Sequence, residues 1–342
     1  MVLGLGSNTF DPGKDIPDLS GNVYVVTGGS AGIGVPSTGH QYEVDEVLIR
    51  PRLRHRSPST RAQPGADLPP RQESRAEEAL REWGDVSRIT SIQIELEDLH
   101  QTAVVAAQLA SSLTRLDALV LNAGLGVGVY SETRDGIDSH FQVNVLAQHH
   151  LLMSLLPILV KTPASRVVFQ SSEFHRLGTS SVHFADLAEL NRDIGAANLY
   201  NRSKLAQVLL AQSLVRHKSQ SQLGLSPSSG PHFLATHPGG VNTDQPAQAE
   251  EAYGTLGQLG VAAARPFTAD PVAQGCRSAL FAATSGAVVE EDLDGAYVVP
   301  DRKVTDVAKQ AKDEALQERC LRLTETLLAA QLGQLPYPTI YA

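Results

Sequence analysis

The sequence predicts an α/β fold built on one doubly wound parallel sheet with helices on both faces. Short apolar runs recur along the 342 residues, and most are followed by a stretch of helical composition. This alternation is typical of parallel sheets, because parallel strands need a crossover segment between them. Hydrophobic residues make up 42% of the chain, which is ample for the core of such a domain.

The first predicted strand, residues 22–26, leads directly into the glycine-rich run 27–34. Gly28, Gly32 and Gly34 allow a backbone to approach phosphate groups, and the N-terminus of a following helix attracts their negative charge. A glycine turn after a strand also occurs as an ordinary tight turn. The run therefore indicates a dinucleotide site only together with other motifs.

The remaining elements follow in the same alternation. Residues 218–231 are polar and rich in Ser, Gly and Pro, which predicts a surface loop. The last predicted strand is expected at the edge of the sheet, and the last helix is expected to close the fold. The pattern predicts strands at residues 88–96, 116–124, 166–172 and 295–300, and helices at residues 75–83, 100–113, 136–160, 199–217, 272–284 and 303–332.

Two of the predicted strands end in polar residues. One ends in Asn122-Ala123-Gly124, where the amide can brace neighbouring backbone and the small residues leave room for a flat ligand. The other ends in Ser171 and Ser172. Ligands of open α/β sheets bind at the carboxyl ends of the strands, so these side chains are expected near a site.

Tyr200 and Lys204 are four residues apart in a predicted helix, so their side chains share one face. An ammonium ion beside a phenol favours the ionised phenol and lowers its pKa. Such a tyrosine can exchange a proton with a carbonyl or alcohol oxygen near neutral pH. A tyrosine and a lysine at this spacing are common by chance, and such a pair is more often two exposed residues of a surface helix.

Taken together, the motifs resemble the short-chain dehydrogenase/reductase family, in its retinol-dehydrogenase-like branch of fungal type. The resemblance runs from about residue 20 to residue 335 and implies a single Rossmann-type domain over residues 1–342. The motifs occur in the family's order: Thr27-Gly28-x-x-x-Gly32-x-Gly34, Asn122-Ala123-Gly124, Asn144, Ser172, Tyr200-x-x-x-Lys204 and His237-Pro-Gly-Gly-Val-Asn-Thr243.

The resemblance implies roles for individual residues. Tyr200 would be the general acid/base, and Lys204 would lower its pKa and hold the nicotinamide ribose. Ser172, favoured over Ser171, would hydrogen-bond the substrate oxygen, and Asn144 would anchor a water in the proton relay. The implied cofactor is NADP, with NAD as the alternative. Its implied contacts are Gly28, Ser30, Gly32, Ile33, Gly34, Glu95, Asn122, Tyr200, Lys204, Val241 and Thr243.

The segment 35–72 does not match the expected helix and second strand. Six prolines and seven arginines fall between residues 35 and 75, and proline is excluded from helix interiors and central strands. Three explanations stay open. The first is a true insertion, with the helix and strand poorly formed between residues 42 and 53. The second is a basic arm that binds the cofactor's 2′-phosphate. The third is a gene-model error. The residue that selects NAD or NADP is therefore not readable.

Composition limits the remaining classes. A net charge of −9 argues against nucleic-acid binding, and two cysteines, Cys276 and Cys320, suit a reducing compartment. The N-terminus has no signal-peptide pattern, and the apolar run 151–160 is too short to span a bilayer. The adjacent His149 and His150 lack a third ligand at metal spacing, so no metal site is predicted. We expect a cytoplasmic protein.

The motifs and the resemblance thus predict an NADP(H)-dependent oxidoreductase that interconverts a ketone or aldehyde and an alcohol on a lipophilic small molecule. The resemblance also implies a place in fungal secondary-metabolite biosynthesis. Residues 244–271 are expected to form a substrate lid. The resemblance implies a homodimer or homotetramer, with the helix at 199–217 and its neighbour forming an interface. Two alternatives remain. A nucleotide-sugar epimerase would want glycine where Ala31 stands, and a non-enzymatic relative would keep the fold for a binding or regulatory role.

Overall fold

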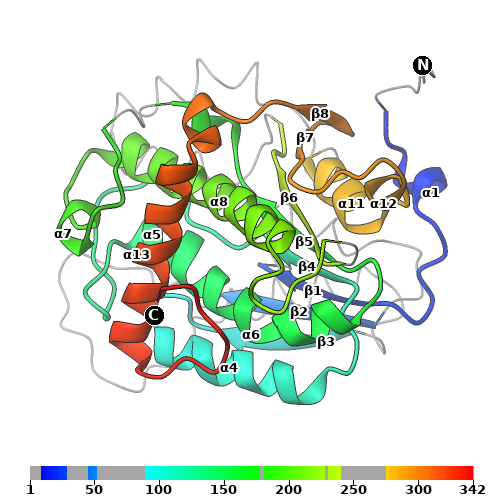
Figure 1. The fold of residues 1–342 in the computed structure, drawn as a ribbon, viewed down its shortest axis with the longest axis horizontal. Coiled ribbons are helices and arrows are strands. Elements are labelled where there is room, and N and C mark those ends of the chain that lie inside the picture. The colour runs from blue at the N-terminus through cyan, green and yellow to red at the C-terminus, as the bar shows by residue number, and fades with distance from the viewer. Residues whose placement is uncertain are drawn as a thin grey trace, which may run out of the picture.

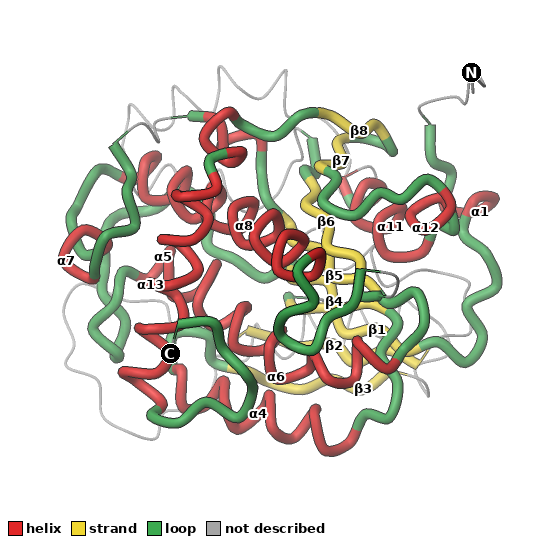
Figure 2. Tube along the Cα trace, viewed as in Figure 1, coloured by secondary structure: helices red, strands yellow, loops and turns green. Residues whose placement is uncertain are grey.

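The computed structural model describes residues 9–28, 45–51, 89–177, 181–227, 230–239 and 275–341. Its described strands form one sheet, with helices packed against it (Figures 1 and 2). All neighbouring strands pair in parallel except the last pair, which is antiparallel. In spatial order the strands are β3 (Ile89–Ile94), β2 (Asp45–Pro51), β1 (Val23–Thr27), β4 (Ala118–Leu121), β5 (Arg166–Gln170), β6 (His232–Thr236), β7 (Tyr297–Val299) and β8 (Lys303–Thr305).

Helices cover both faces of this sheet. On one face lie α4, α6 and α8, with α13 packed against α8 and α4, while α11 packs against β4 to β7 on the other. The helices and helical turns are α1 (Pro12–Asp15), α4 (Leu99–Ser112), α5 (Ser139–Phe141), the π-helical turn η2 (Gln142–Leu146), α6 (Ala147–Lys161), the 3₁₀ turn η3 (Glu173–Arg176), α7 (Leu187–Leu190), α8 (Ala196–Ser219), α11 (Arg277–Thr284), α12 (Ala287–Glu290), the 3₁₀ turn η5 (Lys309–Lys312) and α13 (Glu314–Leu332).

The apolar strands are buried on both sides because successive side chains point to opposite faces. In β4, Leu119 and Leu121 join the core under α6 and α8, whereas Ala118 and Val120 join the core under α11. The same alternation continues in β1, β5 and β6. The predicted doubly wound sheet with helices on both faces is therefore confirmed.

The second strand lies where the first of the three explanations placed it. The position between β1 and β3 is taken by Asp45–Pro51, within the range 42–53. Its backbone pairs with both neighbours, Val47 lying opposite Val25 of β1 and Thr90 of β3. Pairing on both sides overrides a weak local signal, because strand formation depends more on neighbours than on intrinsic propensity.

Two further expectations about the C-terminal part are wrong. The strand predicted at residues 295–300 is not at the edge, because β8 pairs outside it. The helix predicted from residue 303 begins only at Glu314, after β8 and η5. The helix predicted at residues 75–83 and the lid at 244–271 lie outside the described residues.

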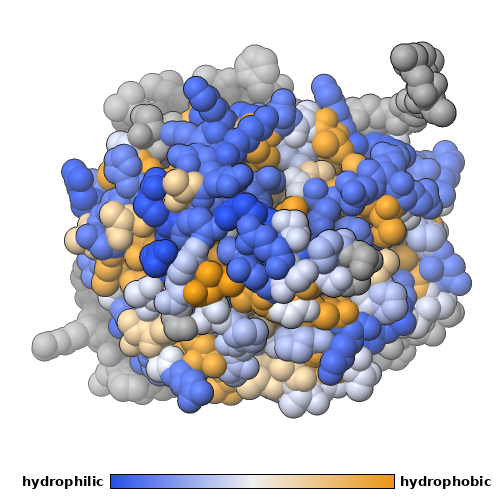
Figure 3. Space-filling view, viewed as in Figure 1, coloured by the Kyte–Doolittle hydropathy of each residue, from blue (hydrophilic) through white to orange (hydrophobic). Residues whose placement is uncertain are grey.

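The predicted subunit interface on α8 finds no support in the packing. Most residues of α8 are buried within this one chain, and α13 packs along it. On the face seen in Figure 3, hydrophilic residues cover most of the upper part and hydrophobic residues form separate patches. A dimer or tetramer therefore stays a prediction, without this helix as its assigned contact.

Among the described residues, one helical run, Ser139–Lys161, is long and apolar enough to pass for a membrane span. In the most apolar window of this run, 78% of the residues are buried inside the fold. The run comprises α5, η2 and α6, and α6 packs against β4 and α4. We therefore interpret it as a core helix.

His149 of α6 makes a prediction about acid stability. The side chain is 1% exposed, and neither ring nitrogen has a hydrogen-bond partner among the described residues. Burial lowers the pKa of His149 to about 3. Because the folded-state pKa lies below the unfolded one of about 6.5, this histidine's contribution to stability is complete above that value and is lost as the pH falls.

We therefore expect His149→Leu to flatten the loss of stability in acid. Between pH 7.5 and pH 5, wild-type protein should lose roughly 2 kcal/mol of unfolding free energy more than the variant. Urea titrations at both pH values measure this difference. His100→Leu, the same change at an exposed position of α4, is the control and should follow wild type. Equal pH dependence in wild type and His149→Leu would contradict this origin.

Candidate active site

The carboxyl ends of the parallel strands bring the predicted site residues to one edge of the sheet. β1 ends at Thr27, β4 at Leu121 and β5 at Gln170, each directly followed by a motif from the sequence analysis. α8 packs against β5 and β6 and supplies Tyr200 and Lys204. The topology thus gathers residues from four distant parts of the chain.

Thr27 locks the first two strand ends together. Its buried Oγ1 accepts the N–H groups of Asn122 and Ala123, both at 2.9 Å. The Asn122 side-chain amide donates to the Thr27 carbonyl at 3.0 Å. The next residue, Gly28, has φ +71°, and a Cβ there would lie 3.0 Å from Ala123 Cα. Both conformation and space therefore require glycine at this turn.

Asn144 lies in the π-helical turn η2, a kind of helix irregularity that is frequent at functional sites. Its side-chain oxygen accepts the Leu125 N–H at 2.7 Å, and its side-chain nitrogen donates to the Leu125 carbonyl and to Ser203 Oγ. Gly124 makes room for it, because a Cβ at that position would lie 2.9 Å from Asn144 Oδ1. The Asn-Ala-Gly motif and Asn144 thus form one packed unit.

The two serines after β5 have different partners. Ser171 Oγ donates to the Lys204 carbonyl at 2.9 Å, so its proton is used inside the protein. Ser172 caps η3, and its Oγ accepts the Phe174 N–H at 3.3 Å. Ser172 therefore keeps its own hydroxyl proton for another acceptor, which agrees with the preference for Ser172 over Ser171.

Tyr200 and Lys204 are both buried, at 4% and 5% exposure. Lys204 Nζ lies 5.5 Å from the centre of the Tyr200 ring and donates to the Gln170 carbonyl at 2.8 Å. It also donates to Gln207 Oε1 at 3.1 Å. Burial lowers the pKa of Lys204 to about 7. The predicted face-sharing pair is thus part of the buried site and not an exposed helical pair.

The remaining predicted cofactor contacts divide into two groups. Glu95 directly follows β3 and is buried at the same edge of the sheet as Asn122. The other six, Ser30, Gly32, Ile33, Gly34, Val241 and Thr243, lie outside the described residues.

His175 belongs to this region although the sequence analysis gave it no role beyond an ordinary loop residue. The ring is fully buried, and its Nε2 accepts the Ala308 N–H at 3.0 Å. The ring proton therefore sits on Nδ1, which donates to the Ser172 carbonyl at 2.7 Å. His175 joins the Ser172 turn to the segment before α13. A signal existed, since His175 is three residues after Ser172, but Ala308 is 133 positions away.

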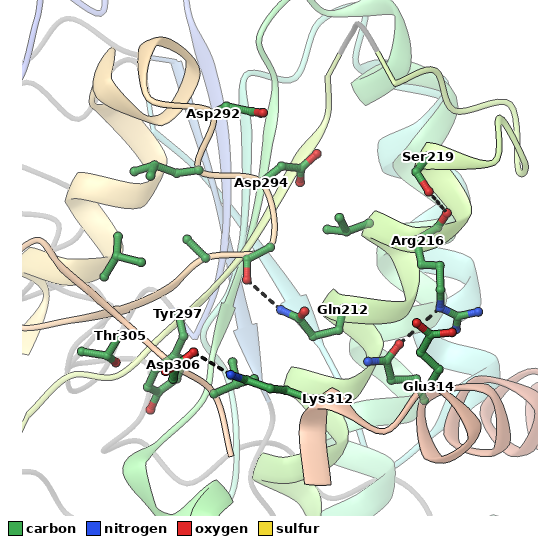
Figure 4. A pocket seen from close by; sticks show the side chains of 17 residues that line it. Gln212, Arg216, Ser219, Asp292, Asp294, Tyr297, Thr305, Asp306, Lys312 and Glu314 are labelled. Carbon is green, nitrogen blue, oxygen red and sulfur yellow. Dashed lines mark hydrogen bonds and ion pairs between the residues drawn. The ribbon is translucent and has the colours of Figure 1, made fainter. Parts of the chain in front are cut away.

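A cavity of ≈680 Å³ lies next to this region, between α8, the loop before β7 and the segment 304–317 (Figure 4). Tyr297 lines it, and its hydroxyl donates to Glu173 of η3 at 3.3 Å. Lys312 on the same wall is paired with Asp306 at 2.6 Å. Because these polar groups already have partners within the protein, we assign the cavity no ligand.

Comparison with known proteins shows the family to which this chain is similar. A family model described as short chain dehydrogenase matches residues 65–183. The Neurospora crassa protein bli-4, named as an oxidoreductase and as mitochondrial, is 32% identical over 95% of this chain and 76% of its own length. The short-chain dehydrogenase/reductase drtF of Aspergillus calidoustus is 28% identical over 91% of this chain and 94% of its own.

A solved short-chain dehydrogenase of Shigella flexneri, complexed with NADP, shares the fold. Its TM-score is 0.53 at 21% identity, over 84% of this chain and 98% of that one. A largely parallel sheet with a buried tyrosine–lysine pair at its carboxyl edge is the arrangement expected of a dehydrogenase with a nucleotide-binding fold. Together with the similarity to bli-4 over most of both chains, this places the protein: the chain belongs to the short-chain dehydrogenase/reductase family.

His175→Leu tests the joint beneath Ser172. The change leaves the buried Ala308 N–H without an acceptor and removes one hydrogen bond from the Ser172 carbonyl. We therefore expect the unfolding free energy to fall by about 1–3 kcal/mol. Urea unfolding measures it, with His183→Leu as the control at an exposed position. A loss below about 0.5 kcal/mol, the usual size for a surface substitution, would speak against the joint.

Proposed function

We propose that this protein is an NADP(H)-dependent oxidoreductase that interconverts a ketone or aldehyde and an alcohol. The observation that carries the proposal is the joint burial of Ser172, Tyr200 and Lys204 at the carboxyl edge of the sheet, with Asn144 packed beside them. The names of the relatives, which include oxidoreductase and short-chain dehydrogenase/reductase, support the reaction class.

The described residues fit a nicotinamide cofactor. Gly28 has no Cβ at the point where the first strand ends, and such turns let a backbone approach a pyrophosphate. Two of the three Lys204 ammonium donors are used by Gln170 and Gln207, which leaves one for a ribose hydroxyl. Asn122 and Glu95 would lie along the rest of the cofactor. NADP is proposed because the Shigella protein of this fold is a complex with NADP.

The chain's own residues would handle the proton. When bound, the nicotinamide cofactor supplies or accepts the hydride. In the reducing direction Tyr200 Oη gives its proton to the substrate oxygen, and the Ser172 hydroxyl donates a hydrogen bond to the same oxygen. The Lys204 ammonium, 5.5 Å from the Tyr200 ring, stabilises the phenolate that remains. The alcohol oxidation reverses these steps.

A lipophilic substrate is supported by apolar surface beside the acid/base. Phe174 is 46% exposed and Leu177 53% exposed, both just after Ser172. The Phe174 ring lies edge-on to the Tyr200 ring at 5.9 Å between centroids. We propose that these residues contact the substrate, with residues 244–271 as its lid. A role in secondary metabolism is part of the same proposal and is tested by the products that accumulate when the gene is deleted.

The cytoplasmic location also stays a proposal. It is supported by Cys276 and Cys320, which are buried thiols that form no disulfide bond. The Neurospora relative is named as mitochondrial, so the two locations compete. Fractionation of cells that express the tagged full chain distinguishes them.

Tyr200→Phe tests the proposed chemistry. The variant keeps the ring but loses the proton that the reaction transfers, so kcat should fall by at least about 100-fold. The dissociation constant of NADPH, measured by fluorescence, should change less than about threefold, which is under 1 kcal/mol. NADPH oxidation with a panel of lipophilic ketones and aldehydes measures kcat.

Tyr341→Phe is the matched control, because Tyr341 contacts Arg322 near the C-terminus and lies outside the proposed machinery. Wild-type turnover retained in Tyr200→Phe would refute the assignment of Tyr200. NADPH binding by wild type without turnover of any carbonyl would favour the non-enzymatic alternative.

A further inference from the structure

We propose that Gln207 is a positioning residue for Lys204. Its side chain holds the Lys204 ammonium group in place and is itself anchored by a hydrogen bond to the main-chain carbonyl of Asn144. The inference rests on the proposed function, because it concerns the lysine assigned to that site. Tyr200, Ser203, Lys204 and Gln207 are spaced i, i+3, i+4 and i+7, which is one stripe of α8.

The Gln207 side chain bridges two other elements of the site. Its Oε1 accepts from Lys204 Nζ at 3.1 Å, and its Nε2 donates to the Asn144 carbonyl at 3.0 Å. An ammonium only donates and a carbonyl only accepts, so these partners determine which way the amide faces. The side chain is 1% exposed, and both partners are buried. No other orientation would satisfy both contacts.

A second chain of hydrogen bonds closes the arrangement into a network. Asn144 Nδ2 donates to Ser203 Oγ at 2.9 Å, and Ser203 Oγ donates to the Tyr200 carbonyl at 2.8 Å. Asn144 is therefore tied to α8 by its main chain through Gln207 and by its side chain through Ser203. Such a closed network holds its members more firmly than separate bonds would.

The contact with Gln207 leaves room for the role that the resemblance implies for Asn144. The Gln207 amide uses one acceptor site of the Asn144 carbonyl, and a carbonyl oxygen has two. The relay water at Asn144 therefore stays a prediction.

A neutral partner also matters for the lysine itself. Burial is the cause of the lowered Lys204 pKa, and the amide does not offset it as a carboxylate would. The titratable side chain next to Lys204 is Tyr200, and Glu173, His175 and Arg176 lie on the turn packed against α8. A carboxylate at position 207 would add a negative charge where the amide oxygen is now 3.1 Å from Nζ.

The test compares Gln207→Glu and Gln207→Leu in the cofactor-free full chain. The readout is the pKa of Lys204, from NMR of ¹³C-labelled lysine side chains, with the signal assigned by its loss in Lys204→Met. We expect Gln207→Glu to raise this pKa by about 1 to 3, the usual effect of an adjacent opposite charge. Gln207→Leu removes the hydrogen-bond acceptor of the Lys204 ammonium and should lower the pKa of Lys204.

Gln212→Leu is the matched control, because Gln212 lies on the same helix, eight residues after Lys204, and donates to the Gly295 carbonyl. The pKa of Lys204 in Gln212→Leu should equal that in the wild-type protein. The arm of the kcat/KM pH profile that reports Lys204 should move in opposite directions in the two Gln207 variants. A general structural effect would move it the same way in both.

The outcomes separate this inference from the proposed function. An unchanged Lys204 pKa in Gln207→Glu overturns the positioning role, whatever the activity. If the Lys204 pKa shifts in opposite directions in the two Gln207 variants but the wild-type protein turns over no carbonyl, the positioning role is supported and the proposed reaction is refuted. If Gln207→Leu does not fold, the isosteric Gln207→Glu still decides, because its expected shift is the larger one.

Discussion

The site depends on one buried positive charge. The Lys204 ammonium is 5% exposed and is held by the Gln170 carbonyl at the end of β5 and by the Gln207 amide on its own helix. Placing an ammonium in a protein interior is costly unless hydrogen bonds compensate. The surrounding polar groups are therefore arranged around it, and its lowered pKa is the direct consequence of its burial.

The sheet provides the frame that makes this arrangement possible. Parallel pairing places the ends of β1, β4, β5 and β6 at one edge, and Thr27 fastens the first two ends through the Asn122 and Ala123 N–H groups. The π-helical turn η2 then directs Asn144 towards α8. The contacts that join separate elements link residues far apart in the sequence, such as Asn144 with Ser203 and Ser171 with Lys204. The site therefore forms only when the core is packed.

Much of this could be predicted from the sequence. The polar residues Asn122 and Ser172, which follow β4 and β5, and the helix face shared by Tyr200 and Lys204 are local patterns that the structure keeps. β2 has a weak signal, because the run Asp45–Pro51 begins with two acidic residues and ends in proline. A strand between residues 42 and 53 was therefore only one of three explanations. Its pairing with strands on both sides decides its conformation.

Gln207 and His175 were missed for a related reason. Each lies close in sequence to one site residue, but its other partner is distant: Asn144 is 63 positions from Gln207, and Ala308 is 133 positions from His175. Spacing shows which residues share a helix face, but not what faces them. The predicted cofactor contacts at residues 30, 32, 33, 34, 241 and 243 lie outside the described residues and stay predictions.

The most direct test of the central claim follows one hydrogen atom. Enzyme loaded with NADPH deuterated at the transferable C4 position is given a lipophilic ketone, and the alcohol is analysed by mass spectrometry. The account predicts deuterium on the carbinol carbon of the product, with the hydroxyl proton derived from solvent. Alcohol without deuterium, or tight NADPH binding without any alcohol, would contradict it.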